Sequence, residues 1–237
     1  MNRNMTTISQ LSPEAAGIYE RIKQTYKVEF DTLKFNEVSL SLLKVADIEP
    51  LLAGRDPFRD VSAFPFWIKL WEASIVLAHL IGSMGPGNGR SFLEIGAGLG
   101  APGLAAAAQG YRTTLSDYQE LILDFERVSA AASGLPDIDF QLIDWLAPPE
   151  LGRFEVMAGA EILFREDFFE PLLALFRKLL APGGTIYLAH DVRRQSLPKF
   201  LLLAEKEYEI AVSTRTMTAG DEKLTIIVNR LQARKTG

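Results

Sequence analysis

The alternation of strand-like and helix-like segments from Ser91 onward is the feature that most constrains this chain's fold. Short apolar runs rich in strand formers are separated by longer runs with helical spacing, most of which end at glycine. The expected strands are SFLEI, YRTTLSD, IDFQLID, FEVMAGA, TIYLAH, YEIAVSTRT and EKLTIIVNRL. Strands that alternate with helices are joined by right-handed crossovers in a mainly parallel sheet. The sequence therefore predicts a Rossmann-like, doubly wound α/β sheet of seven strands that ends in an antiparallel hairpin.

The chain before this region follows another pattern. The Ser-Pro-Glu sequence at residues 12–14 is typical of a helix start. Two runs of strand formers, KVEFDTLKF and VSLSLLKV, flank Asn36 and predict a β-hairpin. An aromatic and aliphatic stripe predicts a further helix over residues 66–81. Because no convincing linker appears, we expect one globular domain, with an N-terminal extension (1–65) packed on a main unit (66–237).

Composition excludes several classes of function. The 237 residues include no cysteine, which rules out disulfides, zinc thiolate sites and cysteine nucleophiles. The formal net charge is -5 and no strongly basic run appears, which argues against nucleic acid as a partner. The first residues lack a signal-peptide core, and the apolar stretch at Ile75–Ile81 is too short to span a membrane. A cytoplasmic protein with no metal site is expected, and the oligomeric state stays open.

The segment FLEIGAGLGAPGLAAAA carries the clearest functional signal. Gly96, Gly98 and Gly100 alternate where a strand ends and a helix begins. Glycines let a ligand approach the backbone, and a helix N-terminus presents free N–H groups. Asp117 ends the next expected strand, where a carboxylate can hold ribose hydroxyls. These residues predict a site for a nucleotide-like cofactor.

Two cofactor classes share this layout. Gly96, Gly98 and Ala101 satisfy the G-x-G-x-x-A form of the dinucleotide fingerprint. The strict glycine alternation, the antiparallel end of the sheet and Glu94 within the strand favour S-adenosylmethionine instead, because Glu94 could approach the cationic amino-acid end of that cofactor. A structural alternative also stands: the glycines permit close helix packing, and Glu94 is satisfied locally.

The same segment, with LSDY, LAPGG and the strand order, resembles class I seven-β-strand S-adenosylmethionine-dependent methyltransferases. LWEASIVLAHLI, LIDW and GAEILFRED are similar to segments of the methyltransferase-like protein-lysine methyltransferases. The resemblance covers roughly residue 66 to the end. It implies a methyltransferase domain over 66–237, S-adenosylmethionine as cofactor, S-adenosylhomocysteine as product, and a lysine of a protein substrate as acceptor.

The resemblance also implies roles for individual residues. Trp71 would line the cofactor pocket, the glycine loop would lie under the methionine part, and Asp117 would hold the ribose. From its position after Asp117, Tyr118 is expected to touch the adenosine or to cap the helix. Asp144 and Trp145 would flank the adenine, and Ala160 would lie against the cofactor. With Glu94 and Gly100 from the loop pattern, the candidate cofactor residues are Trp71, Glu94, Gly96, Ala97, Gly98, Gly100, Asp117, Tyr118, Asp144, Trp145 and Ala160.

The acceptor motif departs from the family pattern. Where the pattern is D-x-x-Y, this chain has Glu161 and Phe164 at the two ends. Glu161 would orient the acceptor amine, and Phe164 would form a wall of the acceptor channel. A small-molecule acceptor and a non-catalytic cofactor-binding module remain alternatives. His190, at a strand end, is a further site candidate, whereas His79 is expected in the core.

Overall fold

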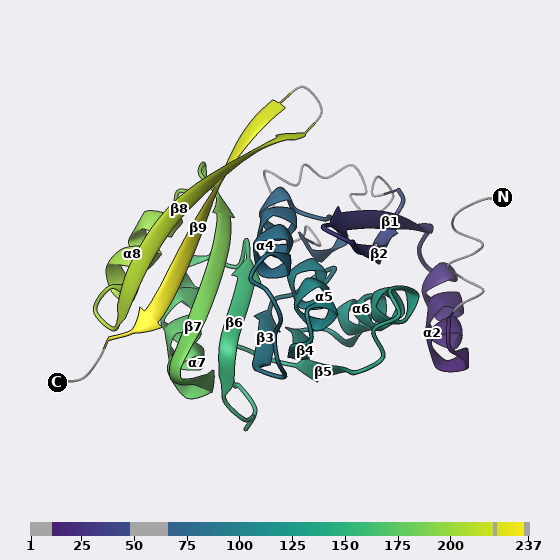
Figure 1. The fold of residues 1–237 in the computed structure, drawn as a ribbon, viewed down its shortest axis with the longest axis horizontal. Helices are drawn as coiled ribbons and strands as arrows, with labels where there is room; N and C mark the ends of the chain where they lie inside the picture. Colours follow the sequence, from purple (N-terminus) through teal and green to yellow (C-terminus); the bar gives the residue numbers. More distant parts are fainter. Residues whose placement is uncertain (1–10, 48–65, 220–221, 235–237) are drawn as a thin grey trace.

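The computed structural model describes residues 11–47, 66–219 and 222–234, and its centre is a seven-stranded sheet (Figure 1). The strand order is β5-β4-β3-β6-β7-β9-β8. Strands β3 to β7 are parallel, and β9 runs antiparallel to both β7 and β8. The bounds are β3 Ser91–Ile95, β4 Arg112–Asp117, β5 Ile138–Leu142, β6 Phe154–Ala160, β7 Leu180–Asp191, β8 Tyr208–Ala219 and β9 Glu222–Ala233. The predicted fold class is confirmed.

Helices cover both faces of the sheet because side chains along each strand alternate between the two faces. On one face, Phe92 and Val156 pack with α4 (Glu72–Gly82) and α5 (Ala101–Ala108). The next residues along the strands, Leu93 and Met157, pack on the opposite face against α7 (Phe169–Leu179) and α8 (Leu197–Ala204). The sheet is therefore the middle layer of three, and its carboxyl edge lies between the two helical layers.

The N-terminal part packs against this sandwich through helix α6 (Glu120–Ala132). It consists of α2 (Pro13–Lys23) and the two-stranded antiparallel sheet of β1 (Val28–Phe35) and β2 (Val38–Val45). The Leu43 N–H donates to Ser129 Oγ at 2.9 Å, and the Ser41 N–H donates to Ser133 Oγ at 2.9 Å. The predicted helix start is confirmed, since Ser12 Oγ accepts from the Ala15 N–H.

Two local predictions were wrong. The stripe at residues 66–81 is not one helix, because extended backbone at Trp71 (ψ 144°) separates a 3-10 turn, η1 (Phe66–Ile68), from α4. Strand β7 is longer than TIYLAH, because a register shift between Phe154 and Val156 lets the strand begin at Leu180. The register shift could not be read from hydrophobic periodicity, since it depends on the partner strand.

The prediction for His79 was also wrong. Its side chain is exposed rather than in the core, and its ring meets Phe35 edge-on with a centroid separation of 6.1 Å. His79 stands in the last turn of α4, where a polar face can point outward from an otherwise apolar helix.

Candidate functional site

The carboxyl ends of four neighbouring parallel strands bring most of the sequence-selected residues to one edge of the sheet. The glycine loop follows β3, and Asp117 ends β4. Asp144 and Trp145 follow β5, and Ala160 ends β6. Ligands of open α/β sheets bind at this edge. The fold thus gathers residues that are far apart in the sequence, from Gly96 to Ala160.

The glycine loop has a backbone that other residues rarely adopt. Gly96, Gly98 and Gly100 have φ angles of 60°, 58° and 73°. Gly100 is the N-cap of α5, so the loop delivers the chain directly into the start of a helix. The alternation of glycines is therefore required by three left-handed positions in one tight turn.

Asp117 fastens this loop to the neighbouring strand. Its Oδ2 accepts the Gly98 N–H at 2.9 Å, and its Oδ1 accepts the Tyr118 N–H at 2.8 Å. The residue is only 6% exposed. Burial raises the pKa of Asp117 to about 6, opposed by the two backbone hydrogen bonds. Each carboxylate oxygen keeps acceptor capacity beyond its one backbone donor.

Two tryptophans lie over the loop. A Cβ at Gly96 would come 3.3 Å from the Trp145 ring, and a Cβ at Gly98 would come 3.6 Å from the Trp67 backbone. Trp67 is itself anchored by Phe125, at a ring-centroid separation of 5.0 Å. Sequence reasoning did not select Trp67 as a site residue, because Trp67 stands within the aromatic and aliphatic stripe that predicted a helix.

Two further carboxyl groups are buried close to the loop. Glu94 is 1% exposed, and its Oε2 accepts the Gly103 N–H in the first turn of α5 at 2.7 Å. Glu126, on α6, is 0% exposed, and neither of its oxygens has a hydrogen-bond partner. Burial raises the pKa of both groups well above the ordinary value. An unpartnered buried acid beside this loop fits a cationic cofactor such as S-adenosylmethionine.

Sequence reasoning missed Glu126. In the sequence it is one charge among several in an amphipathic helix, where a solvated position is the ordinary expectation. Its spacing from the buried residues Ile122 and Ser129 placed it on the inward face of α6, which was the signal that could have identified it.

Glu161 is held by the last residue of β7 and by the turn that follows this strand. Its φ angle is 56°, an unusual value for a residue with a side chain. Its Oε1 accepts the Asp191 N–H at 2.6 Å, and its Oε2 accepts from Arg194 Nε at 2.9 Å. The Glu161 side chain is 9% exposed. The carboxylate therefore has a fixed direction at the carboxyl edge.

Phe164 belongs to a group of three aromatic rings. Its centroid lies 6.3 Å from that of Trp145 and 5.8 Å from that of Phe168. Trp145 and Phe168 meet edge-on at 5.5 Å. Trp145 also lies beside Gly96, so this ring is next to both Phe164 and the glycine loop.

The other candidates have different surroundings. Trp71 is the N-cap of α4, with Lys69 Nζ 4.6 Å from its ring centroid. Tyr118 is 63% exposed, and Asp144 Oδ1 accepts the Leu146 N–H. His190 is fully buried with no hydrogen-bond partner, and desolvation together with Arg194 lowers its pKa to about 3. His190 is therefore part of the interior rather than of an open acceptor cleft.

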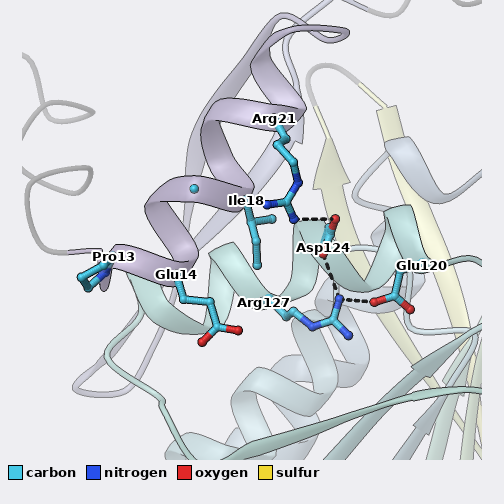
Figure 2. Close-up of a pocket in the computed structure, with 8 residues that line it drawn as sticks. Pro13, Glu14, Ile18, Arg21, Glu120, Asp124 and Arg127 are labelled. Atoms are coloured by element: carbon cyan, nitrogen blue, oxygen red, sulfur yellow. Dashed lines mark hydrogen bonds and ion pairs between the residues drawn. The ribbon is translucent and has the colours of Figure 1, made fainter.

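A separate groove of about 490 Å³ lies between α2 and α6 (Figure 2). Four of its charged side chains pair with one another: Arg127 contacts Glu120 at 2.6 Å and Asp124 at 2.9 Å, and Arg21 contacts Asp124 at 3.6 Å. The sequence-selected site residues do not line it. In the described parts of the chain, no helix is long and apolar enough to cross a membrane, and no cluster of acidic or histidine side chains could hold a metal ion.

The strand order, the glycine loop and Asp117 define a class I S-adenosylmethionine-dependent methyltransferase. The family described as lysine methyltransferase matches residues 66–207, and the chain belongs to it. The sequence is similar to Protein N-lysine methyltransferase METTL21A of Mus musculus, with 28% identity over 151 residues, 60% of this chain and 68% of that one.

Other comparisons agree with this membership. EEF1A lysine methyltransferase 3 of Mus musculus is 29% identical over 162 residues, which cover 61% of this chain and 69% of that protein. The fold is similar to that of the N-methyltransferase NodS from Bradyrhizobium japonicum, solved in complex with S-adenosyl-L-homocysteine. That comparison has a TM-score of 0.52 and 19% identity, and it covers 79% of this chain and 97% of NodS.

Proposed function

We propose that this enzyme transfers a methyl group to a lysine side chain of a folded protein substrate, at the carboxyl edge beside Glu161 and Phe164. The single observation that carries the proposal is the fixed Glu161 carboxylate at the end of β6, next to the aromatic group that also contacts the glycine loop. The names of the METTL21A and EEF1A relatives support a protein lysine as the acceptor.

In this proposal different residues contact different parts of the cofactor. Gly96, Ala97, Gly98 and Gly100 form the floor, and Asp117 accepts from the ribose hydroxyls with its remaining lone pairs. Trp145, Asp144 and Tyr118 flank the adenosine, and Trp71, Glu94 and Ala160 complete the surroundings. S-adenosylmethionine supplies an activated methyl group on a sulfonium, so the protein contributes mainly proximity and alignment.

The acceptor amine must be neutral to react, whereas a free lysine has a pKa of about 10.4. The Trp145, Phe164 and Phe168 rings offer an apolar, partly desolvated surround, which favours the neutral amine. Glu161 would orient that amine through its carboxylate while Arg194 fixes the carboxylate's direction. The proton would leave to water, and Phe164 would guide the side chain as a wall of the channel.

The test is methyl transfer from labelled S-adenosylmethionine into a lysate of the source organism. We expect label in a protein band, at a lysine. Glu161→Gln should keep cofactor affinity and lose about 10²- to 10⁴-fold in turnover, the scale of losing a positioned polar group. Glu166→Gln is the control, because Glu166 is exposed and pairs only with Lys199 on the surface. Label confined to small molecules would contradict the protein acceptor, and full turnover of Glu161→Gln would remove Glu161 from the reaction.

Two organisational proposals accompany the function. We propose that the methyltransferase domain spans 66–237 and that residues 1–65 form an extension packed on it as one globular unit; the contacts of β2 with α6 support this. We also propose that the enzyme acts on proteins rather than nucleic acid, and in the cytoplasm. The absence of cysteine and the net charge of -5 support that assignment.

A further inference from the structure

Glu126 is a buried glutamate whose side chain accepts no hydrogen bond from the described residues. Its carboxyl oxygens are inaccessible to solvent and unpartnered. Isolated carboxylates are too costly to bury in this way, so such a group is neutral or is compensated by something that binds nearby. Glu126 lies directly behind the glycine loop, because a Cβ at Gly100 would come 3.5 Å from its Cγ.

Two neighbouring acids disfavour an ionised Glu126, and one neighbouring cation, Arg127, opposes them. Asp117 at the end of β4 and Glu94 in β3 are both acids that repel an ionised Glu126. The neighbouring cation on the same helix, Arg127, is engaged by Glu120 and Asp124 on the outer side of α6. From the elements packed on α6, Arg21 of α2 pairs with Asp124, and Lys44 of β2 pairs with Asp31 and Glu29.

The three acids differ in their hydrogen bonds. Asp117 accepts two backbone N–H groups, and Glu94 accepts one, from Gly103. These bonds favour the ionised forms, whereas Glu126 accepts none. Glu126 is therefore the member of the cluster whose protonated form the described contacts favour most. Burial together with Asp117 and Glu94 raises its pKa well above the ordinary value.

We propose that Glu126 is a positioning residue that senses the charge of the cofactor: it gives up its proton when cationic S-adenosylmethionine binds and keeps it when neutral S-adenosylhomocysteine binds. The inference rests on the cofactor site assigned above. The two ligands differ by the methyl group that makes the sulfur a sulfonium, so their net charges are +1 and zero. An ionised Glu126 attracts cationic S-adenosylmethionine. With neutral S-adenosylhomocysteine there is no such attraction to offset the desolvation of the buried carboxylate. After transfer, reprotonation of Glu126 removes the attraction that held the substrate form.

The test is titration calorimetry of the full chain with each ligand, in buffers of different ionisation enthalpy. Near pH 7 the protein should release more protons on binding S-adenosylmethionine than on binding S-adenosylhomocysteine, by up to about one per site. The affinity ratio of the two ligands should then rise with pH, by at most about tenfold per unit. Glu126→Gln, close to isosteric and uncharged, should abolish the difference in proton release, while Glu120→Gln on the exposed side of α6 should keep it.

A second measurement follows the carboxyl group directly. The intensity of the protonated-carboxyl infrared band should fall by about one carboxyl group per protein when S-adenosylmethionine is added to the wild type, and should stay unchanged with S-adenosylhomocysteine. Equal proton release for both ligands, or a difference that survives in Glu126→Gln, overturns the proposal. If Glu126→Gln does not fold, the infrared result on the wild type decides. Failure of the folded wild type to bind either ligand would contradict the cofactor site instead.

Discussion

Burial of Asp117 makes its ionised form unfavourable in the folded enzyme without cofactor. Its carboxyl has an ordinary pKa of 3.8 and a folded-state pKa of about 6. Between these values the folded protein holds a proton that the unfolded chain has lost, so stability falls as pH rises from about 4 to 6. Asp117→Asn should remove this part of the pH dependence, about 3 kcal/mol. Urea unfolding of both proteins across this range measures it, and parallel profiles would contradict it.

Substitution of Gly98 tests the folding stability and the cofactor binding of the glycine loop separately. Alanine at its φ of 58° should cost about 1–2 kcal/mol of folding stability through left-handed backbone strain. Gly110→Ala is a matched control, because its φ is 78° and a Cβ there meets nothing within 4 Å. Both variants should lose similar stability in thermal unfolding, but only Gly98→Ala should weaken S-adenosylhomocysteine binding in calorimetry. Equal binding by the two would place the cofactor away from this loop.

At the scale of elements, α6 connects the cofactor site with the N-terminal hairpin. Ser129 Oγ accepts the buried Leu43 N–H and donates to the Phe125 carbonyl. Ser129→Ala should cost about 1–3 kcal/mol, because it leaves the Leu43 N–H unsatisfied in the interior. Ser133→Ala, whose bond to the Ser41 N–H is only partly buried, should cost less. Hydrogen exchange at Leu43, faster in the first variant than in the second, would confirm the direction; unchanged protection would contradict it.

The elements that sequence could predict are those whose signals are local. The seven strands, the hairpin around Asn36 and the glycine loop each have periodicity or turn residues in their own segment. The break at Trp71 and the early start of β7 depend on partners far along the chain. The burial of Glu126 and the pairing of Glu161 with Arg194 likewise arise only when separate elements meet.

At the scale of the molecule, the extension is expected to be inseparable from the fold. Among its described residues, six large apolar side chains are at most 5% exposed: Ile18, Ile22, Phe35, Leu40, Leu42 and Leu43. Burial of each contributes about 1.5–3 kcal/mol, and together they rival the 5–15 kcal/mol stability typical of a domain. A chain beginning at residue 66 should therefore lack a cooperative thermal transition. A cooperative transition with normal cofactor affinity would show that the domain is autonomous.

Strand β9 comes after every other described strand in the chain, yet it lies between β7 and β8 within the sheet. During synthesis, β8 leaves the ribosome before it has a neighbour to pair with, and β7 keeps an unpaired edge. Such edges attract other chains and promote aggregation. The order of synthesis thus leaves the edges of β7 and β8 unpaired until β9 follows, although the site residues from Trp71 to Glu161 have already been synthesised. A nascent chain could hold its cofactor before its sheet is complete.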